Sequence, residues 1–299
     1  MSDKTVIFGV GLIGGSFALA LRRAGLGGRL VGVGRRAETL ARAVELGIID
    51  EAVTSVEQAL DGATLVLIAA PVAQTGPILA SIAPFLQPGT LVTDAGSTKS
   101  DVVAAARTTL GEKIGQFVPG HPIAGSESNG PDAAFATLYV GKKVVLTPLA
   151  ENSAEDIDRV AAAWTACGAV IHRLSAALHD TVFAAVSHLP HLLAFTLVDE
   201  LAQQPHHALL FDYAASGFRD FTRIAGSSPE MWRDISLANN AALLTELDAY
   251  TAHLATVRSM LANNDGAALE AVFRNAQAAR QAWAAAIEAA DQHRRKEDR

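Results

Sequence analysis

Residues 5–16 read Thr-Val-Ile-Phe-Gly-Val-Gly-Leu-Ile-Gly-Gly-Ser. The β-branched and aromatic residues at the start predict a strand, and residues 17–23 have the composition of a helix. The glycines between them follow the pattern Gly-x-Gly-x-x-Gly, in which the first makes a tight turn, the second lets the backbone approach a pyrophosphate and the third packs helix on strand. This context predicts a dinucleotide-binding Rossmann turn. Its cofactor-binding residues would be Gly9, Gly11, Leu12, Ile13 and Gly14.

Strands and helices continue to alternate through the first half of the chain. Apolar runs predict further strands at residues 30–33, 64–70, 90–93, near 116–118, 144–147 and 169–172. Such continuous apolar strands separated by helices, one of them from about residue 154 to 166, indicate a parallel sheet covered on both faces. Beyond Leu174 the chain is rich in Ala and Leu at helical spacing, which predicts helices at residues 239–261 and 267–290 among others. We therefore expect an α/β Rossmann domain over residues 1–173 and an all-α domain over residues 174–299.

Composition excludes several classes of partner. The 299 residues carry a formal net charge of -7, with a pI near 5.7, which leaves no cationic field for nucleic acid or an anionic membrane surface. Cys167 is the only cysteine, so an intramolecular disulfide is impossible. No charged-then-apolar leader precedes the first strand, and no apolar run approaches the ~18 residues of a membrane span. These features predict a cytoplasmic protein.

The end of the strand at residues 30–33 bears on the choice of nucleotide. An acidic side chain there would accept hydrogen bonds from the ribose 2′-hydroxyl, but this chain has Gly34, Arg35 and Arg36. Two guanidinium groups suit a 2′-phosphate, so we expect NADP in preference to NAD. The alternative is that both arginines are solvated residues at the start of the next helix. Ala70 ends the strand predicted at residues 64–70 and Pro71 follows it, and both should line the same cofactor site.

Residues 121–130 read His-Pro-Ile-Ala-Gly-Ser-Glu-Ser-Asn-Gly and carry a candidate base. Oxidation of an alcohol by a nicotinamide requires removal of the hydroxyl proton, and an imidazole with a pKa near about 6.5 can accept it. Pro122 biases His121 toward an extended conformation on a stiff loop. Ser97, at another strand end, would hydrogen-bond the His121 ring or the nicotinamide, or else cap the helix that begins near Lys99. The alternative is that His121 has no catalytic role and is a surface or helix-capping histidine.

Two polar clusters interrupt the helical half. The first is His179-Asp180 with Ser187-His-Leu-Pro-His191, in which Pro190 should kink the helix. The second is Gly217-Phe-Arg-Asp-Phe-Thr-Arg223, followed by Trp232. Three histidines within thirteen residues could recruit zinc, but a structural site requires four ligands and a catalytic site three, usually with acidic residues around them, and no HExxH pattern is present. We therefore expect no metal and favour an anion site at His191. Histidines at helix ends in a subunit interface are the bland alternative.

Five motifs occur in an order that resembles the prephenate/arogenate (cyclohexadienyl) dehydrogenase family of tyrosine biosynthesis. They are Gly9-x-Gly-Leu-Ile-Gly-Gly-Ser16, Asp94-x-Gly-Ser-x-Lys99, His121-Pro-x-Ala-Gly-Ser-Glu127, Ser187-His-Leu-Pro-His191 and Gly217-Phe-Arg-Asp-x-Thr-Arg223. The resemblance implies a Rossmann domain, a helical dimerisation domain and a homodimer. It also implies the NAD(P)-dependent oxidative decarboxylation of prephenate to 4-hydroxyphenylpyruvate, of arogenate to tyrosine, or of both.

The resemblance also implies roles for individual residues. His121 would take the 4-hydroxyl proton, and Ser97 would orient that base and the nicotinamide. His191 and Arg223 match substrate-binding positions, and Glu127 matches a residue that gates the site by pairing with the arginine. Three further residues fall at matched pocket positions, namely Ser126, Asp220 and Trp232.

Two other functions stay open from the residues alone. Another dehydrogenase of a hydroxy acid or an imine would share the glycine turn without needing the His191 and Arg223 motifs. A non-catalytic nucleotide sensor would need no imidazole at the strand ends.

Overall fold

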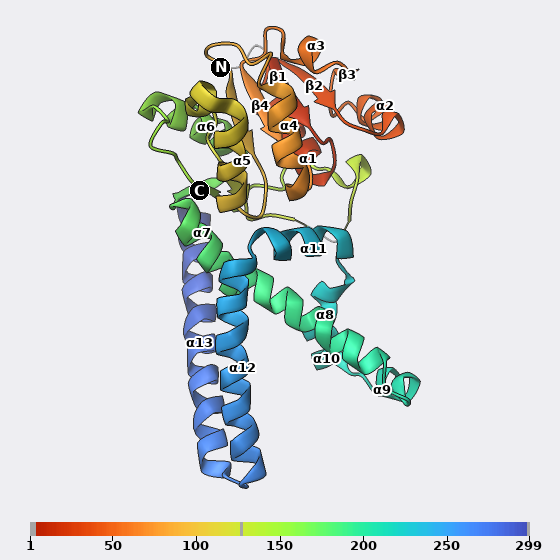
Figure 1. The fold of residues 1–299 in the computed structure, drawn as a ribbon, viewed down its shortest axis with the longest axis vertical. Helices are drawn as coiled ribbons and strands as arrows, with labels where there is room; N and C mark the ends of the chain where they lie inside the picture. Colours follow the sequence, from red (N-terminus) through yellow and green to blue (C-terminus); the bar gives the residue numbers. More distant parts are fainter. Residues whose placement is uncertain (1–3, 126–127, 298–299) are drawn as a thin grey trace. The chain divides into compact units, whose positions relative to one another are not determined.

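The computed structural model describes residues 4–125 and 128–297, with side chains described as far as residue 289. Its first sheet has five parallel strands in the order β3-β2-β1-β4-β5 (Figure 1). The strands are β1 (Lys4–Phe8), β2 (Arg29–Val33), β3 (Glu51–Val53), β4 (Leu65–Ile68) and β5 (Leu91–Asp94). The sheet predicted from the sequence is therefore confirmed. All five carboxyl ends meet at one edge, where ligands of such sheets bind.

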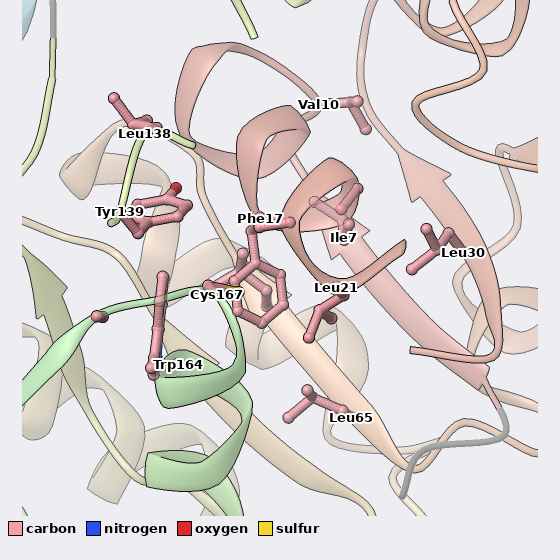
Figure 2. Close-up of a cluster of buried hydrophobic side chains, with 14 of the residues drawn as sticks. Ile7, Val10, Phe17, Leu21, Leu30, Leu65, Leu138, Tyr139, Trp164 and Cys167 are labelled. Atoms are coloured by element: carbon pink, nitrogen blue, oxygen red, sulfur yellow. The ribbon is translucent and has the colours of Figure 1, made fainter. Parts of the chain in front are cut away.

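Alternate residues of each strand enter the two cores that cover the sheet. Ile7 and Leu67 pack under α1 (Leu12–Arg23) and α6 (Ala154–Ala166), where the Phe17 and Trp164 ring centroids lie 4.6 Å apart (Figure 2). Val6 belongs to the opposite core, which is completed by α3 (Val56–Leu60), α4 (Thr75–Ile82) and α5 (Ser100–Leu110). Burial of both faces explains why these strands read as continuous apolar runs. The predicted bounds of α6 agree with the structure.

A second, three-stranded sheet changes the expected surroundings of His121. It consists of β6 (Gly120–Pro122), β7 (Lys143–Leu146) and β8 (Val170–Arg173), with β6 antiparallel and β8 parallel to β7. The strand predicted near residues 116–118 is wrong, because residues 111–116 form a 3₁₀ turn and Phe117 makes only an isolated bridge to Val92. Pro119 has no N–H to continue that ladder. His121 therefore lies in a strand paired with Val145, and the predicted loop position is wrong.

The helical part of the chain begins with one long helical segment over residues 176–202. α7 (Ala176–Phe183) continues through a π-helical turn at Ala184–His188 into α8 (Leu189–Ala202). The distortion expected at Pro190 takes the form of this wider turn directly before it, and Pro190 lies in the first turn of α8. α9 (His207–Asp212), α10 (Ser216–Thr222), a 3₁₀ turn (Arg223–Gly226) and α11 (Pro229–Ala238) follow.

Residues 176–202 also pass the length and composition test for a membrane-spanning helix. Their most apolar 18-residue window has a mean hydropathy of 1.6, and 22% of that window is buried within the chain. The expectation that no run approaches this length is therefore wrong. Core helices of soluble proteins meet the same criterion.

Residues 244–299 form a separate compact unit. It consists of most of α12 (Asn240–Ala262) and of α13 (Gly266–Glu297), which bear out the two helices expected at residues 239–261 and 267–290. Both helices leave large apolar side chains exposed, among them Leu254, Leu261, Phe273 and Trp283.

Candidate functional site

The glycine turn joins β1 to α1 at the carboxyl edge of the sheet. The Gly9 amide donates to the Val33 carbonyl at 2.9 Å, and Gly9 has φ +93°. A Cβ on Gly9 would lie 2.6 Å from the Ala69 carbonyl oxygen, and one on Gly14 would lie 2.1 Å from the Gly9 carbonyl oxygen. A Cβ on Gly11, in contrast, would have no atom within 4 Å. The outer glycines are therefore required by packing, whereas Gly11 opens onto space that a ligand can fill.

The amino end of α1 suits a phosphate. Gly11 is its N-cap, no side-chain cap is formed by the described residues, and the first turn, which includes Leu12 and Ile13, carries no acidic residue. Its first amides and the positive end of the helix dipole are thus available for an anion. The residues present fit the pyrophosphate of a dinucleotide.

The neighbouring strand ends place the other predicted cofactor residues at the same edge. Gly34, Arg35 and Arg36 follow β2 and are exposed, and Arg36 is the N-cap of α2 (Ala37–Glu45). A Cβ on Gly34 would make only an ordinary 3.5 Å contact with Leu40, so packing does not require the missing side chain. Ala70 and Pro71 follow β4, beside the Gly9 turn.

A buried ion pair fixes the backbone next to His121. Lys99 and Asp94 are both fully buried and contact each other, and the Lys99 ammonium also donates to the Gly120 carbonyl at 2.7 Å. Asp94 accepts hydrogen bonds from the Gly120 amide at 3.0 Å and the Gly96 amide at 2.8 Å. Each buried charge in this cluster is paired and hydrogen-bonded. Since both side chains also bond to the backbone of Gly120, the ion pair holds β6 against the end of β5.

His121 itself is half-buried beside Phe183, with the ring centroids 4.9 Å apart. Its Nδ1 lies 2.8 Å from Nε2 of His179, whereas its own Nε2 has no hydrogen-bond partner in the part of the chain that the structure describes. Burial, and then repulsion from His179, Lys99 and His188, lower the pKa of His121 well below its ordinary value. The ring is therefore neutral at pH 7 and has a lone pair to accept a proton.

Asp180 connects this histidine pair to helix α5. Its carboxylate accepts hydrogen bonds from the Lys99 amide at 2.8 Å, the Ser100 amide at 2.7 Å and His179 Nδ1 at 2.8 Å. Burial alone would raise the pKa of Asp180, but these hydrogen bonds outweigh it and lower the pKa to about 2. Asp180 is therefore a carboxylate at neutral pH and caps the amino end of α5.

His188 lies deeper in the same helical stretch. The Asn239 side-chain amide donates to the Asp180 carbonyl at 2.8 Å and lies 3.1 Å from Nδ1 of His188. Nε2 of His188 is buried with no partner among the described residues. Burial lowers the pKa of His188 to about 4, although Asp180 opposes the shift.

His191, Trp232 and Arg223 come together as predicted from their motifs. The His191 and Trp232 rings stack with centroids 3.5 Å apart and planes at 19°. His191 Nδ1 donates to the Ser187 carbonyl at 2.9 Å, so its Nε2 is left to face a ligand. Burial lowers the pKa of His191, and Arg223 is close enough to lower it further. The proximity of an imidazole and a guanidinium suits the binding of an anion.

Ser97 lacks the hydrogen bond to His121 that was one of its expected contacts, and Asp220 is exposed. Ser97 is half-buried, but the His121 ring pairs with His179, and no hydrogen bond joins Ser97 to it. Ser97 does not cap the next helix either, because α5 begins at Ser100 and its cap is the Asp180 carboxylate. Asp220 is exposed and lies 3.5 Å from its equally exposed neighbour Arg219. Ser126 and Glu127 lie outside the described residues.

The sequence indicated some of this network but not its connections. His179 and Asp180 stood out as a polar pair in an apolar helix, and Lys99 closed a recognisable motif, but Asn239 gave no signal. The described residues contain no group of three or more His, Cys, Asp or Glu side chains placed to hold a metal ion.

Comparisons with known proteins agree with this geometry. A family model described as the nucleotide-binding domain of prephenate dehydrogenase matches residues 17–173, and one described as the dimerization domain of prephenate dehydrogenase matches residues 175–275. The cyclohexadienyl dehydrogenase of Zymomonas mobilis is 38% identical over 279 residues, which cover 92% of this chain and 94% of that protein.

Two solved structures share the fold over nearly the whole chain. Prephenate dehydrogenase from A. aeolicus, in complex with hydroxyphenyl propionate and NAD+, has a TM-score of 0.87 and 38% identity, covering 93% of this chain and 97% of that chain. Synechocystis arogenate dehydrogenase has a TM-score of 0.80 and 31% identity, covering 94% and 99%. The chain belongs to the prephenate dehydrogenase family of oxidoreductases.

Proposed function

We propose that this enzyme catalyses the NAD(P)-dependent oxidative decarboxylation of prephenate, of arogenate, or of both. The observation that carries the proposal is the neutral His121 ring, whose Nε2 has no described partner and which follows the ion pair at the end of β5. Relatives that act on each substrate support it, since similar chains include a cyclohexadienyl, a prephenate and an arogenate dehydrogenase.

Different residues of this chain would carry out different parts of the reaction. His121 takes the proton of the substrate's 4-hydroxyl group at Nε2. Arg223 and His191 bind substrate carboxylate or side-chain oxygen atoms, with Trp232 holding the His191 ring in place. A nicotinamide, when bound, would accept the hydride, and Ser97 would help to hold it. As the hydride leaves carbon 4, the ring carboxylate departs as carbon dioxide and its bonding electrons complete the aromatic ring.

A direct assay tests the activity. The protein is incubated with prephenate or arogenate and with NAD or NADP, and nicotinamide reduction is followed. His121→Asn should fold and bind nucleotide but lose about 10² to 10⁴ in kcat. Near-native kcat in that variant would remove His121 from the role of base. Arg223→Ala should raise KM for the substrate far more than KM for the nucleotide, and an unchanged substrate KM would remove it from carboxylate binding.

We infer that NADP is preferred over NAD. Exposed Arg35 and Arg36 follow β2, where an acidic side chain would be needed to accept hydrogen bonds from the ribose 2′-hydroxyl. Replacing both arginines with Ala should weaken NADP binding selectively, because guanidinium groups form charge-assisted hydrogen bonds with a 2′-phosphate. An equal loss of affinity for NAD and NADP would contradict the preference.

We further propose a cytoplasmic homodimer with its domain boundary after residue 173. The family description of residues 175–275 as a dimerization domain and the exposed apolar side chains of α12 and α13 support a dimer. A dimer interface is also the proposed use of the apolar surface of residues 176–202. Sedimentation equilibrium should give about twice the chain mass of 31.2 kDa, and a monomer at micromolar concentration would overturn the proposal.

A further inference from the structure

His121, His179 and Asp180 form a continuous chain of hydrogen bonds that ends on the backbone of α5. The first link joins His121 Nδ1 to His179 Nε2 at 2.8 Å, and the second joins His179 Nδ1 to the Asp180 carboxylate at 2.8 Å. The carboxylate in turn accepts from the amides of Lys99 and Ser100. His179 is fully buried, so its ring cannot exchange these partners for water.

The chemistry of the last acceptor determines the protonation of both rings. Asp180 is ionised and can only accept hydrogen bonds, so His179 must carry its proton on Nδ1. Burial lowers the pKa of His179, which keeps that ring neutral with a lone pair on Nε2. A lone pair on His179 Nε2 needs a donor opposite it, and the atom opposite is His121 Nδ1. The other neutral tautomer of His179, protonated on Nε2, would place its Nδ1 lone pair 2.8 Å from the Asp180 carboxylate, with no hydrogen between the two acceptors.

We propose that His179 and Asp180 act as positioning residues that hold His121 in its Nδ1–H tautomer, with the Nε2 lone pair directed at the substrate. The inference rests on the proposed role of His121 as the base. No proton moves along the chain in this arrangement: His121 gains the substrate proton at Nε2 and keeps its own proton on Nδ1. The two buried partners restrict both the tautomer and the orientation of the ring, as the third member of a catalytic triad does.

The anchoring of Asp180 explains why the arrangement is rigid. Its carboxylate is held by α5, and its carbonyl accepts a hydrogen bond from Asn239 at 2.8 Å. On the other side, the Lys99 ammonium donates to the Gly120 carbonyl, one residue before His121. Both ends of the chain of hydrogen bonds are therefore held at the start of α5. The His121 end is held through the Lys99 side chain, and the Asp180 end through the hydrogen bonds that its carboxylate accepts from the Lys99 and Ser100 amides.

The first test observes the tautomer directly, without substrate. Protein labelled with ¹⁵N-histidine is examined by long-range ¹H–¹⁵N correlation spectra, and signals are assigned with His121→Asn and His179→Asn. We expect His121 and His179 each to show a protonated-type Nδ1 and an unprotonated-type Nε2. A wild-type spectrum in which His121 is mainly the Nε2–H tautomer would overturn the proposal.

A matched pair of variants separates positioning from packing. In His179→Gln the side-chain oxygen can reach the place of Nε2 and still accept from His121, whereas the shorter side chain of His179→Asn can reach Asp180 but not His121. We expect His179→Asn to lose the single tautomer of His121 and about tenfold in kcat, with the substrate and nucleotide KM values changed less than twofold. His179→Gln should keep the His121 tautomer and more of the turnover.

Equal behaviour of the two variants, at similar melting temperatures, would contradict the proposal. If either variant fails to fold, the wild-type spectrum still decides. Should the protein turn over neither prephenate nor arogenate while His121 shows the Nδ1–H form, the proposed function fails and the tautomer assignment stands.

Discussion

Two helices begin at the same edge of the parallel sheet, and their amino ends are used in opposite ways. α1 follows β1, has Gly11 at its N-cap and receives no side-chain cap from the described residues. α5 follows β5, and its first amides donate to the Asp180 carboxylate, 80 residues further along the chain. Both ends offer the same unpaired donors and the same positive dipole. One end is left to a ligand, and the other is occupied by the protein's own anion.

The surroundings of each end match its use. A Cβ at Gly11 would meet nothing within 4 Å, which leaves room for a phosphate. Around α5, Asp180 is buried, and it is satisfied by two backbone amides and by His179. The α5 end thereby holds the helix that carries three of the site's histidines against the Rossmann sheet. The same backbone feature thus offers free donors to an anion at α1 and anchors the histidine-bearing helix at α5.

The largest effect on stability is expected from removing the Asp180 carboxylate that caps α5. Asp180→Ala removes the cap and leaves the buried Lys99 amide, the partly buried Ser100 amide and His179 Nδ1 without their acceptor, so we expect a loss of about 3 kcal/mol in the free energy of unfolding. Urea denaturation measures it. Ser153→Ala is the matched control, because the Ser153 hydroxyl caps α6 at the exposed Asp156 amide and also donates to the exposed Asp156 carboxylate, so its removal should cost about 1 kcal/mol. Equal costs for the two caps would show that Asp180 is an ordinary cap.

A somewhat smaller effect is expected from filling the α1 end. Gly11 has φ -104°, which any residue adopts, so Gly11→Asp should fold and supply α1 with a carboxylate cap like that of α5. The carboxylate would compete with the phosphates, and nucleotide affinity should fall about a hundredfold, or about 2.8 kcal/mol. Calorimetric titration measures the affinity. The isosteric Gly11→Asn separates charge from size, and an Asp variant that binds nucleotide as well as the Asn variant would argue against a phosphate site.

The sequence predicted the α1 end well because all of its determinants are local. A strand, three glycines at fixed spacing and a helix lie within about twenty residues, and each glycine's role follows from backbone sterics. The buried strands were equally readable as apolar runs, whereas β3 was missed because it has only three residues.

The α5 end could not be predicted, because its partners lie far apart in the sequence. His121 and His179 are separated by 58 residues and Lys99 and Asp180 by 81, and no periodicity reports such contacts. Ser97, expected beside His121, stood in the right motif, but the buried pair Asp94 and Lys99 determines how β6 lies there. The motif resemblance named the residues that we propose to contact ligands, and the structure was needed for the residues that position them.

The pH dependence of stability tests the packing of the helical stretch that carries His179, His188 and His191. The pKa of His188 falls from an unfolded value of about 6.5 to about 4, so between these values the unfolded chain binds more protons and stability decreases as the pH falls. This one group should cost about 2 kcal/mol of unfolding free energy between pH 7 and pH 5. The lowered pKa values of His179 and His191 add to the loss in the same direction. Denaturation curves across this range measure it, and His188→Asn should reduce the slope. A stability independent of pH from 7 to 5 would mean that these rings are solvated and that the helix held by Asp180 is not packed as the structure has it.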